Sequence, residues 1–196
     1  MFTYNGQVIT NNHKWLKGSD TPPTPPGPSF DEVTIGNQTW MAKNLAIDDG
    51  GTGIYVVDDV SANGVDFGTQ YYYSWTAAKR LADSIDGWHL PSENEYQTLI
   101  NYVGGDNIAG KKLKSTTGWY GGYNGTDDYG LCVLPVGYYG GSSLYYAGSE
   151  TRLWTSSQLD RYEYGSVWFR WNHNDATFFS TSGDGYSCSV RLVKDS

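Results

Sequence analysis

Two stretches of the chain carry apolar residues at the spacing of an amphipathic helix. The first covers residues 75–83, with Ser74 placed to cap its N-terminus. The second begins after Ser92, which forms a capping box with Glu95, and it ends at Gly104-Gly105. The apolar stripes that define the two helices are Ala78, Leu81 and Ala82 in the first and Tyr96, Leu99, Ile100 and Val103 in the second.

Shorter apolar runs predict strands. Residues 33–41 indicate a hairpin around Gly36-Asn37, and residues 131–135 indicate a buried strand. Residues 48–68 are rich in Gly and Asp and are typical of a loop. Near the C-terminus the apolar residues alternate, as in a strand with one buried face: Cys188, Val190 and Leu192. We therefore predict an α+β fold with two helices, short antiparallel sheets and long loops.

The N-terminal thirty residues have a different pattern. Residues 2–10 favour a hairpin with Asn5-Gly6 as its two-residue turn, and residues 11–16 could add a third strand. Five of the seven prolines fall between residues 22 and 28, which is typical of an extended spacer. A docking site for a proline-binding domain is the alternative. We predict an appendage at 1–18 that anchors or assembles the protein as a homo-oligomer or particle component, a linker at 19–30 and one domain at 31–196.

Charge and composition narrow the range of partners. The 196-residue chain has a net charge of −8 and no basic run, so nucleic acid is not an expected partner. No apolar stretch reaches the ~18 residues of a membrane span, so membrane insertion is not expected either. The first residues lack the features of a signal peptide. Cys132 and Cys188 could form a disulfide, but without an export signal we expect reduced, buried thiols.

Histidines and acidic residues offer little catalytic chemistry. The three histidines are scattered, without metal-ligand spacing, and His89, just before a capped helix, is expected to be a packed structural residue. Asp127 and Asp128, with Asn124, could supply oxygen ligands to a structural calcium ion. The alternative is a turn in which these side chains accept backbone N–H groups. We expect no other cofactor, no catalytic metal and no enzymatic activity.

Residues 158–184 have the composition of a binding surface. They are rich in Tyr, Trp, Phe, Asn, Asp, Arg, Ser and Gly with little apolar rhythm, whereas the stretches on either side, 153–157 and 189–193, resemble packed strands. Rigid aromatic side chains give contact area at low entropic cost, and Asn, Ser and Gly adapt their hydrogen bonds. The ligand-binding residues predicted from this segment are Gln158, Asp160, Arg161, Tyr162, Tyr164, Trp168, Arg170, Asn172, His173, Asn174, Thr177 and Phe179.

Strand alternation sorts the aromatic residues of this segment. If Val167, Phe169 and Trp171 point inward, then Trp168 and Arg170 point outward, together with residues 172–174. An exposed group of Trp, Tyr and Arg residues is typical of an interaction site. A surface that is merely rich in tyrosine is the alternative.

Several segments together resemble one protein family. They are residues 33–45, 87–92, 112–115, 124–130, 153–157 and 189–195, which begin VTIGNQTWMAKNL and end SVRLVKD. In this order they are similar to the domain named for the large paralogous set of Fibrobacter succinogenes, common in gut Bacteroidetes and their phages. The resemblance implies a C-type-lectin-like fold, close to that of the formylglycine-generating enzymes.

The same fold carries the variable proteins of diversity-generating retroelements, including phage tail receptor-binding proteins. In those proteins codon randomisation is concentrated in a C-terminal segment that ends in a fixed strand, and residues 158–184 are similar in place and composition. The enzyme relatives need two nearby cysteines for copper, and this region has only Cys188. The tripeptides of calcium-dependent sugar-binding lectins do not occur in the chain.

These observations lead to one expected function and one alternative. We expect a non-enzymatic receptor-binding protein in a phage virion tail, made in the bacterial cytoplasm, that binds a protein or glycan on the host-cell surface. The alternative is an adhesin-type domain on the bacterial cell surface, or a secreted one, that binds protein or glycan.

Overall fold

A computed structural model describes residues 3–4, 7–8, 28–183 and 185–195 of the chain. Near the N-terminus, β1 (Thr3–Tyr4) pairs with β2 (Gln7–Val8) in antiparallel register, which confirms the pairing of the two strands expected there; the Asn5-Gly6 turn lies outside the described residues. The expected third strand at 11–16 and most of the proline-rich linker lie outside the described residues. The assembly role of residues 1–18 stays a prediction.

Both predicted helices are present. Helix α1 (Trp75–Asp83) begins after Ser74, whose hydroxyl accepts the N–H of Ala77, and α2 (Glu93–Tyr102) begins after Ser92. The capping box of α2 is complete, because Ser92 and Glu95 each accept the other's backbone N–H.

The prediction of two helices was wrong in number, because a third follows directly. Helix α3 (Asp106–Leu113) starts after Gly105, which had indicated only the end of α2. Its Gly110 lowers helix propensity, yet a Cβ there would come within 2.0 Å of the carbonyl oxygen of Asp175. A glycine therefore lets the helix pack against the backbone of a distant turn. A short 3₁₀ turn, η1 (Tyr120–Gly122), follows.

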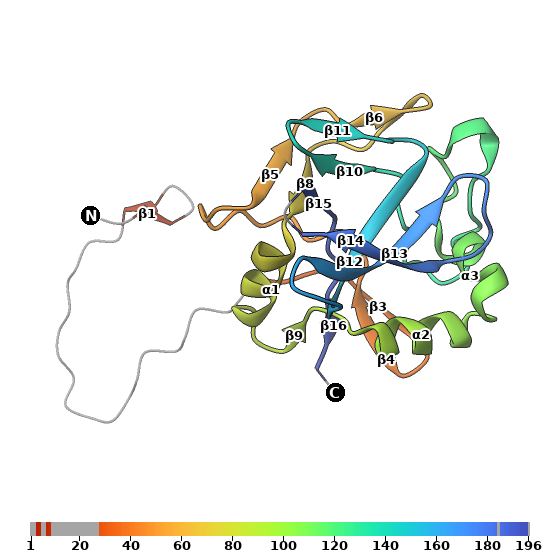
Figure 1. The fold of residues 1–196 in the computed structure, drawn as a ribbon, viewed down its shortest axis with the longest axis horizontal. Coiled ribbons are helices and arrows are strands. Elements are labelled where there is room, and N and C mark those ends of the chain that lie inside the picture. The colour runs from red at the N-terminus through yellow and green to blue at the C-terminus, as the bar shows by residue number, and fades with distance from the viewer. Residues whose placement is uncertain (1–2, 5–6, 9–27, 184, 196) are drawn as a thin grey trace.

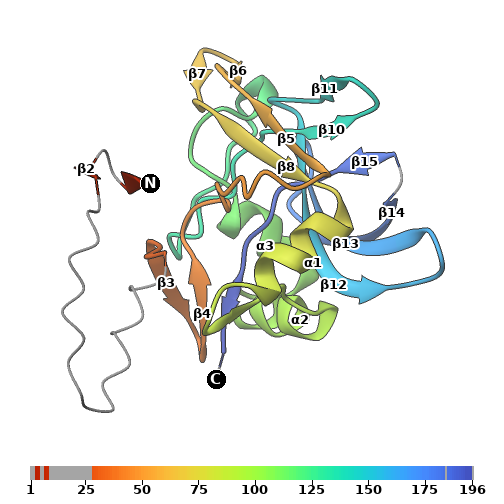
Figure 2. The same cartoon turned by 90° about the vertical axis from the view of Figure 1, so that its left-hand side faces the viewer.

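The strands form several small antiparallel sheets (Figures 1 and 2). The predicted hairpin is β3 (Glu32–Ile35) and β4 (Gln38–Met41), in a four-stranded sheet of order β3-β4-β16-β9. A second sheet has the order β12-β13-β14, a third has the order β11-β10-β15, and β5-β8 and β6-β7 form pairs. The other strands are β5 (Ile54–Val57), β6 (Ser61–Ala62), β7 (Val65–Asp66), β8 (Gln70–Tyr73), β9 (Trp88–His89), β10 (Tyr138–Gly140), β11 (Ser143–Tyr145), β12 (Glu150–Gln158), β13 (Glu163–Arg170), β14 (Thr177–Ser182), β15 (Tyr186–Ser187) and β16 (Val193–Lys194).

Three local predictions need correction. Residues 48–68 are not simply a loop, because they contain β5, β6 and β7. Residues 131–135 are buried in part but form no continuous strand: Cys132 has a φ of 51°, and only Val133 makes a bridge, to Lys114. Residues 158–184, which looked patternless, consist mainly of regular strands.

Strand β12 separates two hydrophobic cores. Its consecutive residues Leu153 and Trp154 point to opposite faces, so Leu153 packs in the core that contains α2 and α3, and Trp154 packs in the core that contains α1. In Figure 1, β12, β13 and β14 cross the middle of the domain, with β10 and β11 above them, α2 below and α3 at the right. The sheet therefore lies at the centre of the domain.

The longest helix in the described part of the chain is α2, with ten residues. Among the described residues no helix combines the length and apolarity needed to span a bilayer.

Candidate ligand-binding surface

The register of the central sheet places several predicted site residues on one face. Arg152, Trp168 and Thr177 stand opposite one another on β12, β13 and β14. The next row, Leu153 with Val167, points to the other side and is buried in the core. Alternate residues of a strand share a face. Glu150, Arg170 and Phe179, each two positions from a residue of the first row, therefore lie on the same outer face as Arg152, Trp168 and Thr177. Trp168 and Arg170 therefore lie on the face expected from the alternation.

Arg152 is the centre of this face. Its guanidinium carbon lies 4.3 Å from the ring centroid of Tyr138, 4.9 Å from that of Phe179 and 5.2 Å from that of Trp168. The guanidinium of Arg170 lies 4.4 Å from the ring of Trp168. Positive charge over aromatic faces is attracted by the ring quadrupoles, and burial strengthens the attraction. Arg152 itself is only 9% exposed, so it fixes the positions of the rings around it.

Glu150 supplies the opposite charge. One of its carboxylate oxygens lies 3.3 Å from Nη2 of Arg152, and it stands directly opposite Arg170 in the sheet. Burial raises the pKa of Glu150, and the nearby guanidinium of Arg152 opposes the shift without cancelling it. Nε of Arg152 has no hydrogen-bond partner among the described residues. The two buried charges balance each other, so the outer surface of the cluster is presented mainly by rings.

Tyrosines extend this face onto the neighbouring sheet. The ring centroid of Tyr138, on β10, lies 5.9 Å from that of Tyr145, 5.8 Å from that of Tyr146 and 5.3 Å from that of Tyr186. Tyr145, Tyr146, Tyr186 and Phe179 are between 39% and 57% exposed. We call the continuous set the aromatic surface; it consists of Tyr138, Tyr145, Tyr146, Arg152, Trp168, Phe179 and Tyr186.

Most of the aromatic surface was not predicted from the sequence. Arg152 lies just before the packed stretch 153–157 and outside the binding segment 158–184, and the tyrosines of residues 138–146 lie in a Gly- and Tyr-rich run for which no site was predicted. Strand alternation gave one indication of the position of Arg152. Leu153 points into the core that contains α2 and α3, so Arg152 and Trp154 point to the opposite face of β12. The approach of β10 to this face is a long-range contact, and local patterns do not reveal it.

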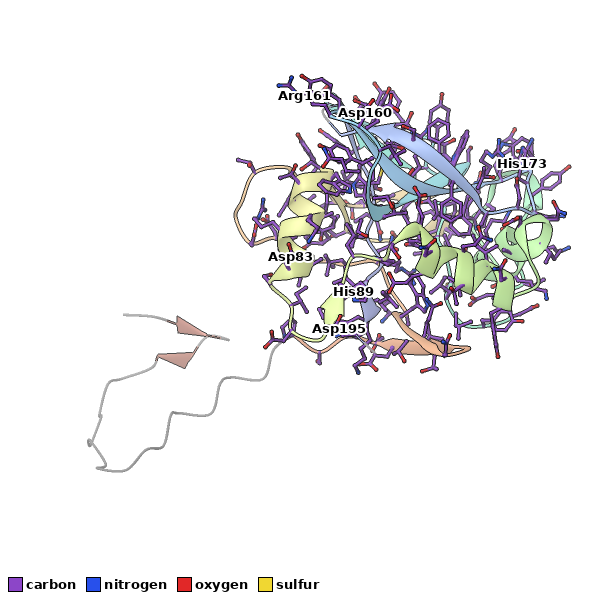
Figure 3. All side chains as sticks on the ribbon, turned by 60° about the horizontal axis from the view of Figure 1, so that its bottom comes forward. Asp83, His89, Asp160, Arg161, His173 and Asp195 are labelled. Carbon is purple, nitrogen blue, oxygen red and sulfur yellow. The ribbon has the colours of Figure 1, made fainter. Side chains whose placement is uncertain are left out.

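Four of the predicted residues lie together where β12 ends and the loop to β13 begins. Gln158, the last residue of β12, is exposed, as are the loop residues Asp160, Arg161 and Tyr162, and Oδ1 of Asp160 accepts the N–H of Tyr162. Figure 3 shows Asp160 and Arg161 at one extremity of the molecule, well separated from His173. Tyr164 differs from its neighbours, because it stacks on Trp75 at 4.3 Å between ring centroids and is half-buried.

Asn172, His173 and Asn174 lie at the opposite end of β13, in the turn that leads to β14. Strand β13 has eight residues, which corresponds to roughly 23 Å between its ends. The loop and the turn therefore cannot belong to one small-molecule site. Only a macromolecular ligand could contact all twelve predicted residues at once.

A buried lysine holds that turn in place. Nζ of Lys114 donates hydrogen bonds to the carbonyl oxygens of Tyr123, Arg170, Trp171 and His173, at 2.9 to 3.3 Å. Lys114 is 1% exposed, and burial lowers its pKa to about 8. The ammonium group therefore satisfies backbone groups of the turn from the side of the core.

The acidic loop uses its side chains within the protein. Oδ1 of Asp127 accepts the N–H of Cys132 at 2.7 Å, and Oδ1 of Asn124 accepts the N–H of Trp119 at 3.0 Å. Burial raises the pKa of Asp127. Among the described residues there is no group of three or more His, Cys, Asp or Glu side chains arranged to hold a metal ion. Both contacts agree with the alternative to a calcium site, a turn in which these side chains accept backbone N–H groups.

The cysteines are not bonded to each other. Cys188 is buried in the core beside Trp154, and Cys132 is half-exposed at a cavity of about 410 Å³ that Leu45, Phe67 and Leu134 also line. Burial raises the pKa of both thiols, so each stays protonated near neutral pH. This cavity shares no residue with the aromatic surface.

His89 links the C-terminal segment to helix α2. Its Nδ1 lies 2.6 Å from Oδ1 of Asp195, and its Nε2 lies 2.6 Å from Oε1 of Glu95 (Figure 3). Burial by itself lowers the pKa of His89, but the hydrogen bonds with Asp195 and Glu95 outweigh it, and the pKa is raised. These two contacts join the C-terminal segment to α2, and the purely structural role expected for His89 stays a prediction.

This arrangement predicts a pH-dependent contribution to stability. Because the folded-state pKa lies above the unfolded value of about 6.5, the contribution is complete below that pH and is lost as the pH rises through the folded pKa. We expect His89→Gln to lower the free energy of unfolding more at pH 5.5 than at pH 9. Urea titrations of both proteins at the two pH values would measure this, and an equal difference at both would contradict it.

The comparisons with known proteins agree with the motifs along the chain. The family model described as the Fibrobacter succinogenes major domain matches residues 33–194. No curated protein and no solved structure matches the chain. The match covers most of the chain and every element from β4 to β16. The chain therefore belongs to the Fibrobacter succinogenes major domain family.

Proposed function

We propose that this protein is a non-enzymatic binding protein that presents the aromatic surface, on a C-type-lectin-like scaffold, to a receptor on a host cell. The observation that carries the proposal is the continuity of the rings. Aromatic and cation–π contacts run without interruption from Tyr145 on β11, through Tyr138 and Arg152, to Phe179 on β14. Two separate sheets contribute to this one surface.

The chemistry of the surface favours a macromolecular ligand. Tyr, Trp and Arg dominate the energetics of protein interfaces, and exposed groups of large rings are rare unless they bind something. Arg152 is paired with Glu150, and Nη2 of Arg170 lies 3.6 Å from Asp175. Since the charges are paired internally, the binding energy would come from the rings, and the exposed loop at 159–162 would add polar contacts.

Three further features of the proposal concern the carrier. The scaffold is proposed to be lectin-like on the basis of the family resemblance, and the carrier is proposed to be a phage tail, with residues 1–18 as its anchor and 19–30 as its spacer. Residues 158–184 would be open to diversification. The alternative carrier is the bacterial cell surface, where the same surface would act as an adhesin for protein or glycan.

The test is a cell-binding measurement with matched variants. The double variant Tyr146→Ser, Phe179→Ser removes two exposed rings of the aromatic surface, and Tyr102→Ser, Tyr120→Ser removes two exposed rings that do not belong to it. We expect the first to bind cells at least tenfold more weakly than wild type, since hot-spot side chains contribute about 2 kcal/mol or more each. The control should bind as wild type does.

Fluorescently labelled protein and a panel of Bacteroidetes isolates would serve for the measurement. Melting temperatures would establish that each variant is folded. Equal binding by the surface variant and wild type, or the absence of binding to every isolate, would contradict the proposal. Detection of the chain in purified virions would separate the phage carrier from the cell-surface carrier.

A further inference from the structure

The two edges of the central sheet differ in how their backbone groups are used. Along β12 the outer edge is covered, because backbone bonds join Gly137 N–H to the Glu150 carbonyl, Trp154 N–H to the Ser189 carbonyl and Ser156 N–H to the Pro91 carbonyl. Along β14 no main-chain group outside β13 bonds the strand, within the part of the chain that the structure describes. β14 is therefore an open edge.

The sequence of β14 contains none of the usual protections of an open edge. Its six residues, Thr-Phe-Phe-Ser-Thr-Ser, include no charged residue and no proline. Natural edge strands are commonly blocked by Lys, by Pro, by bulges or by very short length. β-branched and aromatic residues, in contrast, favour pairing with a further strand.

The register shows which backbone groups face outward. Gly183 donates its N–H to the carbonyl of Tyr162 at 2.9 Å, which makes this a hydrogen-bonded pair at the end of the β13–β14 ladder. Bonded and non-bonded pairs alternate in an antiparallel ladder, so Phe178, Ser180 and Ser182 direct their N–H and C=O groups away from β13. Donors and acceptors repeated every second residue, roughly 7 Å apart, match the backbone of an extended peptide.

We propose that β14 is a strand-addition site, at which an extended segment of a protein ligand pairs with this edge; the inference rests on the proposed binding function. Half of the side chains of the added strand would lie on the same face as Phe179 and Trp168 and would pack beside the aromatic surface. Main-chain bonds would give affinity, and the rings would give selectivity. A second copy of the chain is a poorer occupant, because each copy carries a net charge of −8.

The test uses a display library of linear twelve-residue peptides selected on the wild-type protein. Ser180→Pro removes one outward N–H without removing a bond to β13, and Ser180→Ala, which keeps that N–H, is the matched control. We expect the selected peptides to bind Ser180→Ala as they bind wild type and to bind Ser180→Pro at least tenfold more weakly. Thermal unfolding would show that both variants are folded.

A second measurement needs no variant of the protein. Methylating every second backbone nitrogen of a selected peptide should abolish binding for one set of positions and leave it unchanged for the other, because only one set faces β14. Sensitivity at both sets or neither, failure to select any peptide, or equal binding by Ser180→Pro would overturn the inference. A dimer sensitive to Ser180→Pro in sedimentation would overturn it in favour of self-pairing.

Cell binding separates this inference from the function on which it rests. If Tyr146→Ser, Phe179→Ser loses cell binding while Ser180→Pro retains it, the aromatic surface binds without strand addition, and only the inference fails. If both variants bind cells as wild type does, the proposed function fails as well.

Discussion

Replacement of Arg191 by Met is expected to lower the free energy of unfolding by about 4 kcal/mol or more, out of the 5–15 kcal/mol typical of a domain. Arg191 is 1% exposed. Its guanidinium donates to Oδ1 of Asn44 at 2.7 Å and to the carbonyls of Met41, Leu131 and Cys132 at 3.0, 2.6 and 3.2 Å. Without the arginine, four acceptors lose their donor. The contacts to Met41 and Leu131 are buried and those to Asn44 and Cys132 partly buried, and a buried acceptor costs about 1–3 kcal/mol when unsatisfied.

Two further variants sharpen this prediction. Arg191→Lys should be nearly as damaging as Arg191→Met, since one ammonium cannot reproduce the fork that reaches two segments of the chain, 41–44 and 131–132. Lys194→Met, three residues away, removes an exposed pair with Glu32 and should cost less than about 1 kcal/mol. Urea titrations would give the three free energies. Stability of Arg191→Met within 1 kcal/mol of wild type would contradict the role assigned to the guanidinium.

Lys114→Met is expected to cost about 3 kcal/mol or more, because it leaves the carbonyls bonded by Nζ without their donor. The folded-state pKa of about 8 lies below the unfolded value of about 10.5. Between these values the unfolded chain holds more protons, so the stability of wild type relative to the variant should rise with pH. Urea titrations at pH 7, 8.5 and 10 would measure both effects.

The control for this prediction is Lys111→Met, which changes an exposed lysine three residues before Lys114. It should leave the free energy of unfolding within about 0.5 kcal/mol of wild type. Equal losses for the two variants would show that the bonds of Nζ do not stabilise the turn.

Features governed by local chemistry were predictable from the sequence. The capping box at Ser92 and Glu95 and the Gly36-Asn37 turn between β3 and β4 each depend on residues within a few positions of one another, and both are present. Helix α3 was missed for the opposite reason. Gly110 lowers local propensity, but it is required by contact with Asp175, sixty-five positions away. Cys132 likewise leaves the strand conformation where the distant Arg191 binds its carbonyl.

The candidate surface also combines features set by local sequence with features set by distant contacts. Alternation along β13 was enough to place Trp168 and Arg170 on one face, because the period of a strand is fixed. The position of Arg152 among three rings depends on the pairing of β12 with β13 and on the approach of β10. The pairing of distant strands is a property of the whole fold. Arg152 and the tyrosines of the aromatic surface could therefore not be identified from the local sequence pattern.

The anchoring of the β13–β14 turn by Lys114 has a consequence for how this protein can change. Nζ bonds to carbonyl oxygens, which every amino acid carries, and to no side chain of residues 170–173. The shape of the turn is thus specified by a residue outside it. Substitutions at Asn172, His173 or Asn174 can change the side chains that the turn exposes while Lys114 still bonds the same backbone carbonyls. The side chains of the turn can therefore vary without a change in its backbone conformation.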